Sequence, residues 1–228
     1  MKRYTIIWDF DGTLFPREPY DSEQSLLIHR LIQSKDSISL FKRVLIRAII
    51  YADMKERLRK TFKKLYIWFL KGTKTETLDL IAGLLAKKIS EADRQTLLRL
   101  KEDGHNMMVI SCGTADLSER ILKVAGLDNC FSIIEGNRFQ INNDQITGMD
   151  FHIPNPEDKL KLITSQGICP EESIVIGDGY TDFPLLDWAG IPVLIDRTGE
   201  KKDRYAKKNY HYISSIPEIV EVIEKDFV

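Results

Sequence analysis

The sequence predicts an α/β protein whose core is a doubly wound, mostly parallel sheet. Two observations support this prediction. From residue 106 onwards, short apolar runs alternate with segments of helical spacing, as in successive strand–helix units. The first apolar run, at residues 4–9, stands apart from these units because no strand is apparent between residues 22 and 99. We therefore expect a helical segment to be inserted after the first strand.

The first strand is predicted at residues 4–9, where nearly continuous apolar residues suit a central strand covered on both faces. Within the insertion, Leu58, Phe62, Leu65 and Phe69 recur at helical spacing. This spacing predicts a helix that buries the face carrying these four side chains.

The remaining elements follow from alternating apolar patterns and turn residues. In chain order we expect helices at 75–88 and 90–102, a strand at 106–111, a helix at 112–126, a hairpin at 130–148, a helix at 156–167, a strand at 173–179, a helix and strand within 185–196, and a last helix at 214–225. Ser215 and Glu218 stand at capping-box spacing at the start of that last helix.

Composition narrows the class of protein. The 228 residues carry a net charge of −1, which argues against a general affinity for nucleic acid, so no nucleic-acid partner is expected. The three cysteines form no CxxC pair, which excludes a disulfide framework and a zinc site and favours a reducing, cytoplasmic location. The apolar run near the N-terminus is too short for a signal peptide, and none approaches the roughly 18 residues of a membrane span.

Polar residues follow three of the predicted strands. Asp9 and Asp11 follow the first, Ser111 ends the second, and Asp178 and Asp182 follow the strand at 173. Because the carboxyl ends of parallel strands share one edge of a sheet, four aspartates can converge there. Their mutual repulsion calls for a hard divalent cation, and an oxygen-only ligand set favours Mg²⁺ over zinc.

A simpler interpretation exists for each of these residues taken alone. A single aspartate after a strand is more often a turn former or a helix cap, and Asp182 could cap a helix that begins near Phe183. Likewise, Ser111 alone could be an ordinary polar strand end. The simpler interpretation weakens because polar residues follow three strands at corresponding positions.

The motifs DFDGT, VISCGT and GDGYTD, with a lysine at the start of a helix between the last two, resemble the four ordered motifs of the haloacid dehalogenase-like (HAD) superfamily of phosphohydrolases. The insertion and the stretch GNRFQINNDQITG resemble the phosphoserine-phosphatase-like branch. This resemblance implies a Rossmann-like α/β core at residues 1–16 and 90–228. It also implies a helical, C1-type cap at residues 17–89.

The resemblance implies a division of labour between the first two aspartates. Asp9 would be the nucleophile that forms an aspartyl-phosphate, which divides one difficult displacement into two. Asp11 would protonate the leaving alcohol and then deprotonate the hydrolytic water. Family members that cleave carbon–halogen or carbon–phosphorus bonds lack an aspartate at this second position. Asp11 therefore favours phosphate-ester chemistry.

The resemblance also implies a metal site. Asp178 and a carboxylate oxygen of Asp9 would bind Mg²⁺ together with the backbone carbonyl of Asp11. Asp182 would orient the metal-bound waters.

Four residues are expected to bind the substrate's phosphate. Ser111 would donate its hydroxyl group to a phosphoryl oxygen, and the amides of Cys112 and Gly113 lie near a helix N-terminus that favours an anion. Lys159, at the start of its helix, is our choice for the lysine that neutralises the phosphoryl charge. Lys161 remains the alternative.

The insertion is strongly basic. Residues 41–74 contain eleven Lys or Arg and two acidic residues, a local charge of +9. These cations could be solvated helix faces, or they could attract an anionic substrate or an anionic membrane surface. Arg47, Arg57 and Arg59 could each touch a substrate, but no spacing distinguishes one of them. The acid and base with which related enzymes bind phosphoserine have no evident counterpart in the insertion.

The sequence therefore predicts a Mg²⁺-dependent phosphatase that hydrolyses a small phosphate monoester through an aspartyl-phosphate. One alternative is a phosphotransferase on the same fold. Another is a non-catalytic or membrane-surface binding module, against which the complete set of Asp9, Asp11 and Asp178 argues.

Overall fold

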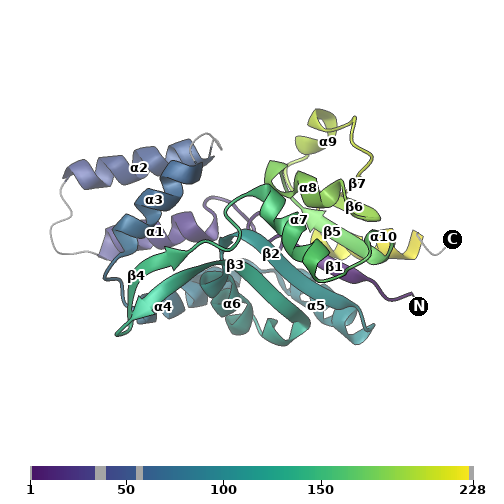
Figure 1. Cartoon of the computed structure of the whole chain (residues 1–228), viewed down its shortest axis with the longest axis horizontal. Coiled ribbons are helices and arrows are strands. Elements are labelled where there is room, and N and C mark those ends of the chain that lie inside the picture. Colours follow the sequence, from purple (N-terminus) through teal and green to yellow (C-terminus); the bar gives the residue numbers. More distant parts are fainter. Residues whose placement is uncertain (1, 34–39, 55–58, 226–228) are drawn as a thin grey trace.

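The computed structural model describes residues 2–33, 40–54 and 59–225, and its centre is a seven-stranded sheet with the order β4-β3-β2-β1-β5-β6-β7 (Figure 1). All neighbouring strands are parallel except β3 and β4. The strands are β1 (Thr5–Trp8), β2 (Asn106–Thr114), β3 (Phe131–Asn142), β4 (Gln145–Asp150), β5 (Ser173–Gly177), β6 (Ile191–Ile195) and β7 (His211–Ile213). The predicted doubly wound, mostly parallel sheet is thus confirmed.

Helices cover both faces of the sheet. They are α1 (Ser22–Gln33), α2 (Leu40–Met54), α3 (Arg59–Leu70), α4 (Thr75–Leu85), α5 (Glu91–Glu102), α6 (Ala115–Val124), α7 (Pro156–Ser165), α8 (Phe183–Leu186), α9 (Lys201–Arg204) and α10 (Ile219–Lys225). Side chains of α1 to α6 and of α10 pack in one apolar core, and α7 and α8 contribute to a second core on the other face (Figure 1).

Strand β1 lies at the centre of the sheet, between β2 and β5. Ile6 and Trp8 point into one core and Ile7 into the other, and all three are buried. This arrangement explains the continuous apolar run, because a strand covered on both faces has no solvent side. It also places the residues that follow Trp8 at the middle of the sheet edge.

The described residues between β1 and α5 contain helices and no strand, as the sequence predicts. The buried face of α3 differs from the prediction, however. Phe62, Tyr66 and Leu70 are buried, whereas Leu65 and Phe69 are only partly so, and Leu58 lies outside the described residues. The face is rotated because Tyr66 packs against Phe139 of β3, with 6.0 Å between ring centroids.

The predicted hairpin is formed by β3 and β4. Asn143 and Asp144 form its turn with positive φ angles of 47° and 58°, as a two-residue hairpin loop requires. Strand β4 also pairs with the link between α3 and α4, since Gly72 donates to the Ile146 carbonyl and Ile146 donates to the Thr73 carbonyl. The hairpin therefore connects the sheet to the inserted helices.

Other differences from the predicted elements are local. Strand β2 continues three residues past the expected end at Ser111, and the short elements α9 and β7 were not predicted. All three cysteines are free, as expected from their number and spacing. None of the helices in the described part of the chain is both long and apolar enough to span a bilayer.

Candidate active site

The loop after β1 turns sharply at the sheet edge. The Phe15 amide donates to the Phe10 carbonyl, and the Gly12 amide donates to the Phe15 carbonyl. Gly12 has a φ of +90°, and a Cβ at this position would overlap the carboxyl group of Asp178. Only glycine satisfies both conditions without strain. The loop therefore brings the segment of Asp9 and Asp11 into direct contact with the segment of Asp178.

Lys159 lies at the centre of the candidate site. Its Nζ donates to Asp9 Oδ1 at 2.7 Å and to Asp182 Oδ1 at 2.6 Å, and the side chain is buried. Burial alone would lower the pKa of Lys159, but the Asp182 and Asp9 carboxylates outweigh burial and raise it above its ordinary value. The lysine is therefore a fixed cation between two carboxylates from different strand ends.

The structure distinguishes the two lysines of α7. The side chain of Lys159 is 1% exposed, whereas that of Lys161 is 75% exposed and pairs with Asp158 on its own helix. Asn155 and Asp158 form a capping box at the N-terminus of α7, so the first turn is well defined and directs Lys159 inward. Of the two, Lys159 alone reaches the strand ends.

Asp182 holds the loop that carries Asp178. Asp182 Oδ2 accepts the backbone N–H groups of Asp178 and Gly179 at 2.9 and 3.2 Å, while Oδ1 accepts Lys159. Burial and the charge of Asp9 raise the pKa of Asp182 to about 6, opposed by Lys159. Because protein groups contact both of its oxygens, Asp182 organises the site.

Asp9, Asp178 and Asp182 each offer a carboxylate oxygen, and the three atoms lie within 4.8 Å of one another. Asp178 Oδ1 is buried and has no hydrogen-bond partner in the described structure. A buried carboxylate oxygen without a donor is unfavourable unless a cation compensates it. This oxygen, with Asp9 nearby, fits a hard divalent cation such as Mg²⁺. The Asp11 side chain is not part of this cluster.

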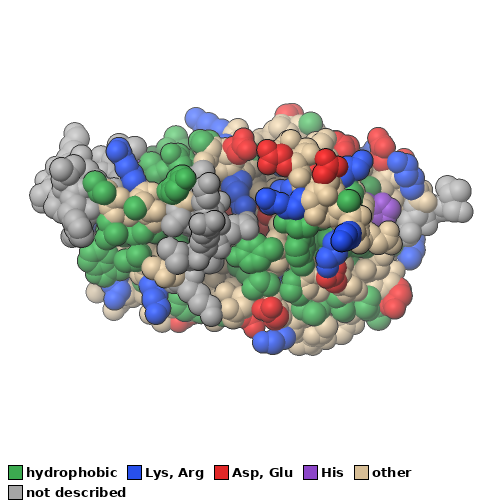
Figure 2. Space-filling model, turned by 90° about the horizontal axis from the view of Figure 1, so that it is seen from above, with side chains coloured by type: hydrophobic (Ala, Val, Ile, Leu, Met, Phe, Trp, Pro, Cys, Tyr) green, Lys and Arg blue, Asp and Glu red, His purple; other side chains and the backbone are tan. Residues whose placement is uncertain are grey.

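Two cations approach the other oxygen of Asp178, and neither was predicted from the sequence. Lys201 Nζ of α9 donates to Asp178 Oδ2 at 3.0 Å, and Arg17 Nη1 lies 3.6 Å from the same atom. Both residues belong to segments remote from the GDGYTD motif, so only the folded chain brings them there. Figure 2 shows the molecule hollowed between the α2–α3 end and the α7–α9 end, with Lys and Arg side chains at its edge.

Asp11 points away from this cluster, toward the start of α1. Its Oδ1 accepts the backbone N–H of Ser22 and its Oδ2 contacts the Ser22 hydroxyl group, both at 2.8 Å. Burial, and then the charge of Asp21, raise the pKa of Asp11 to about 8. A carboxyl group with this pKa holds a proton near neutral pH. The two aspartates of the first motif therefore differ in direction and in hydrogen-bond partners.

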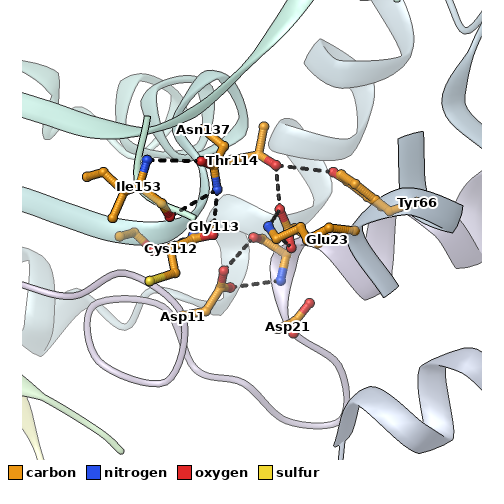
Figure 3. A network of polar contacts seen from close by, with 12 residues as sticks. Asp11, Asp21, Glu23, Tyr66, Cys112, Gly113, Thr114, Asn137 and Ile153 are labelled. Atoms are coloured by element: carbon orange, nitrogen blue, oxygen red, sulfur yellow. Dashed lines mark hydrogen bonds and ion pairs between the residues drawn. The ribbon is translucent and has the colours of Figure 1, made fainter. Parts of the chain in front are cut away.

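The segment of Ser111, Cys112 and Gly113 lies beside Asp11. A Cβ placed on Gly113 would lie 3.2 Å from both Asp11 Oδ2 and Ser111 Oγ, and the Gly113 N–H donates to Ser111 Oγ at 3.0 Å. Asn137 of β3 is completely buried and fixes this segment by donating to the Cys112 carbonyl at 2.9 Å (Figure 3). This role of Asn137 was not predicted from the sequence.

A second polar network joins the inserted helices to the sheet (Figure 3). The carboxylate of Glu23 pairs with Lys63 of α3 through both oxygens and accepts the hydroxyl group of Thr114 at the end of β2. Tyr66 Oη lies 3.5 Å from Thr114 Oγ1. All four side chains are buried. Nothing in the sequence distinguished Lys63 from the other cations of the insertion.

Of the three arginines singled out in the insertion, the structure describes the side chain of Arg47 alone. Arg47 is exposed on α2. Arg57 lies outside the described residues, and the structure describes only the backbone of Arg59.

Comparison with known proteins gives a consistent result. A family model described as haloacid dehalogenase-like hydrolase matches residues 6–187. A phosphoserine phosphatase of Archaeoglobus fulgidus is 27% identical over 203 residues, which are 87% of this chain and 54% of that protein. A phosphoserine phosphatase of Polaromonas sp. is 24% identical over 197 residues, 82% of this chain and 77% of that protein. The chain thus spans about half the length of the Archaeoglobus relative.

Solved structures share the fold over nearly the whole chain. A substrate-bound phosphoserine phosphatase complex superposes with a TM-score of 0.70 at 18% identity and covers 99% of both chains. A Bordetella pertussis protein of unknown function gives a TM-score of 0.71 at 13% identity, over 93% of this chain and 99% of that one. These likenesses establish the architecture and, at such identities, nothing further.

Proposed function

Because the chain belongs to the haloacid dehalogenase-like hydrolases, we propose that it is a phosphatase that hydrolyses a small phosphate monoester through an aspartyl-phosphate. One observation carries the proposal. Lys159 bridges Asp9 and Asp182, while a buried oxygen of Asp178 beside them has no partner. A carboxylate nucleophile, a fixed cation and an unfilled oxygen site are what attack on a dianionic phosphate requires.

In the first proposed step, a carboxylate oxygen of Asp9 bonds to phosphorus and the phosphorus–oxygen bond to the alcohol breaks. The leaving oxygen takes the proton of Asp11, so a neutral alcohol departs. In the second step, Asp11 takes a proton from water, whose oxygen bonds to phosphorus as the Asp9–phosphorus bond breaks. Inorganic phosphate is released, and Asp9 and Asp11 return to their initial states.

The remaining residues stabilise charge. Lys159 would neutralise the phosphoryl oxygens, and Ser111 with the Cys112 and Gly113 amides would donate hydrogen bonds to them. Asp178 and Asp9 would hold Mg²⁺ with the Asp11 carbonyl, while Asp182 orients the surroundings. When bound, the metal supplies positive charge that lowers the repulsion between nucleophile and phosphate.

The inserted helices would determine the substrate. We propose that residues 17–89 act as a cap over the core at residues 1–16 and 90–228, which excludes water during phosphoryl transfer. Two relatives are named phosphoserine phosphatase, so phosphoserine is the first substrate to test.

The test is hydrolysis of a panel of phosphate monoesters, including phosphoserine and p-nitrophenyl phosphate, with Mg²⁺ and then with excess EDTA. We expect phosphate release that depends on the metal. Absence of turnover with every ester would favour a binding module, and transfer to an added alcohol in place of water would favour a phosphotransferase.

A second test is independent of turnover. If Asp178 and Asp9 hold Mg²⁺, the metal should raise the thermal unfolding midpoint, because a ligand that binds only the folded state stabilises it. Asp178→Asn should remove this metal-dependent shift. An equal shift in the variant would refute the proposed metal site.

Peripheral binding to an anionic membrane is a second candidate. Helices α2 and α3 expose Val44, Tyr51 and Trp68 together with Arg47 and Lys64, a mixture suited to an anionic interface. Co-sedimentation with vesicles that contain phosphatidylserine, against neutral vesicles, tests it. Lack of binding to both would leave these cations as a solvated surface. A cytoplasmic location, proposed from the cysteine content, is compatible with either result.

A further inference from the structure

The first turn of α1 makes an unusual contact with the candidate site. Ser22, the first residue of the helix, is completely buried and gives both its backbone N–H and its hydroxyl group to the Asp11 carboxyl group, at 2.8 Å each. The first N–H groups of a helix have no partner within the helix. Here one of them is used to hold the side chain that would transfer the proton.

The first turn is itself held in place from its N-terminal side. Asp21 Oδ1 accepts the backbone N–H of Gln24 at 2.7 Å, and Gln24 Oε1 accepts the backbone N–H of Asp21 at 3.4 Å. This reciprocal pair is a capping box, which fixes the point at which the helix begins. Ser22 consequently has little freedom to move relative to the rest of α1.

The turn is also attached to two other elements. Glu23, the residue next to Ser22, pairs with Lys63 of α3 and accepts the hydroxyl group of Thr114 (Figure 3). Thr114 ends β2, the strand that carries Ser111 and Gly113. Helix α1 is therefore fastened to the same strand end that would bind the phosphate.

These contacts bear on proton transfer. A carboxyl group held at one oxygen can rotate about its bond to Cβ, whereas one held at both oxygens has a fixed plane. Proton transfer needs the donor oxygen within hydrogen-bond reach of the leaving oxygen, and small displacements lower the rate steeply. The hydroxyl and amide of Ser22 therefore supply the geometric control that Asp11 needs and that the core strands do not provide.

We propose that Ser22 is a positioning residue that orients Asp11 for proton transfer, and that the contacts of Glu23 with Lys63 and Thr114 hold Ser22 against the phosphate-binding strand. The inference rests on the proposed phosphatase function. It makes the first inserted helix part of the acid–base machinery as well as part of the cap.

The test compares two esters that differ in their need for a proton. An alkyl phosphate must receive a proton on its leaving oxygen, whereas 2,4-dinitrophenyl phosphate releases a stable phenolate without one. The constant kcat/KM reports the steps up to departure of the leaving group. In Ser22→Ala we expect kcat/KM for the alkyl phosphate to fall by about tenfold or more, and kcat/KM for the dinitrophenyl ester to change by less than about threefold.

Three controls isolate the role of Ser22. Ser22→Thr keeps the hydroxyl group and should recover much of the alkyl phosphate activity. Ser173→Ala removes a buried serine hydroxyl group that donates to the Pro170 carbonyl at the start of β5, and should affect both esters equally and weakly. In Asp11→Asn, adding Ser22→Ala should cause little further loss, because residues that act through one another are not additive.

Each outcome is decisive. An equal loss for both esters in Ser22→Ala would show a structural role and overturn the inference. An increase in alkyl phosphate activity would show that Ser22 restrains Asp11, and would overturn it as well. If the unaltered protein hydrolyses neither ester, the proposed function fails and this inference fails with it. If the unaltered protein hydrolyses both esters and Ser22→Ala loses both equally, only this inference fails.

Discussion

Two buried lysines, Lys159 and Lys63, have different surroundings. Lys159 lies at the sheet edge between Asp9 and Asp182, beside an Asp178 oxygen that has no partner. Lys63 lies among the inserted helices and pairs with Glu23, which also accepts the Thr114 hydroxyl group. In the first cluster one buried carboxylate oxygen has no partner, although Lys201 and Arg17 approach the other oxygen of the same Asp178 side chain. In the second cluster the described contacts pair both oxygens of one carboxylate with one lysine.

The difference shows how buried charge can be assigned a role. In a buried ion pair, the attraction between the two charges offsets the free energy lost when they leave water. Such a pair fixes the packing of the helices that carry it. A cluster that keeps a buried carboxylate oxygen without a donor is unfavourable unless a further cation binds that oxygen. The Lys159 cluster is therefore where chemistry is expected, and the Lys63 cluster is where the insertion is held to the core.

The largest expected effect lies in the first cluster. Asp9→Asn keeps the size of the side chain but removes the nucleophile, so kcat should fall by more than about 10³-fold. Thermal unfolding should show that the variant remains folded. Asp128→Asn, a change at an exposed aspartate, is the matched control and should keep full activity. A variant of Asp9 that retained turnover would place the nucleophile elsewhere.

The two lysines of α7 test the second part of the same cluster. Lys159→Met removes the cation between Asp9 and Asp182, and we expect kcat to fall by about 10² to 10³-fold. Lys161→Met, on the exposed side of the same helix, should change kcat by less than about twofold. Steady-state kinetics on both variants decide the matter, and equal losses would contradict the assignment of Lys159.

The second cluster should respond mainly in stability. Lys63→Met leaves the buried Glu23 carboxylate without its cation, so the free energy of unfolding should fall by about 3–5 kcal/mol. Denaturant unfolding measures this change. Adding Glu23→Gln removes the uncompensated charge and should recover part of the loss. If the double variant were no more stable than Lys63→Met, the pair would not be the source of the effect.

The smallest effect is expected at the edge of the second cluster. Tyr66→Phe removes only a hydroxyl group that lies 3.5 Å from Thr114 Oγ1, so the free energy of unfolding should fall by about 0.5–1 kcal/mol. The same denaturant titration applies. A loss as large as that of Lys63→Met would mean that the Tyr66 hydroxyl group matters as much to stability as the Lys63–Glu23 pair. The expected order of effects within the second cluster would then be wrong.

Residues at strand ends could be predicted from the sequence because their environment is defined locally. Asp9, Asp11, Ser111 and Asp178 each follow an apolar run, and the topology of a parallel sheet then brings such positions to one edge. Lys159 was chosen over Lys161 from its place at the start of a helix, and the structure brings it to Asp9. For the four residues at strand ends, a periodic pattern and one topological rule were sufficient to place them at one edge of the sheet, whereas the choice between the two lysines was decided by the folded chain.

Ser22, Glu23, Lys63 and Asn137 could not be found in this way. Ser22 and Glu23 look like an ordinary helix start, Lys63 is one of many cations in the insertion, and Asn137 is one polar residue in a β-hairpin. Their partners are between 11 and 91 residues distant along the chain. Spacing within a helix or strand carries no information about a partner at such separations.

The sequence by itself determined the alternation of strands and helices, the insertion after β1 and the types of chemistry-bearing residue at the strand ends. These properties depend on local propensity and on the two periods of secondary structure, 2.0 and 3.6 residues. Only the tertiary structure decided which face of α3 is buried, which lysine is enclosed by carboxylates and what holds Asp11. Those outcomes depend on packing between segments that are distant in the chain, where the cost of burying each charge without a partner selects one arrangement.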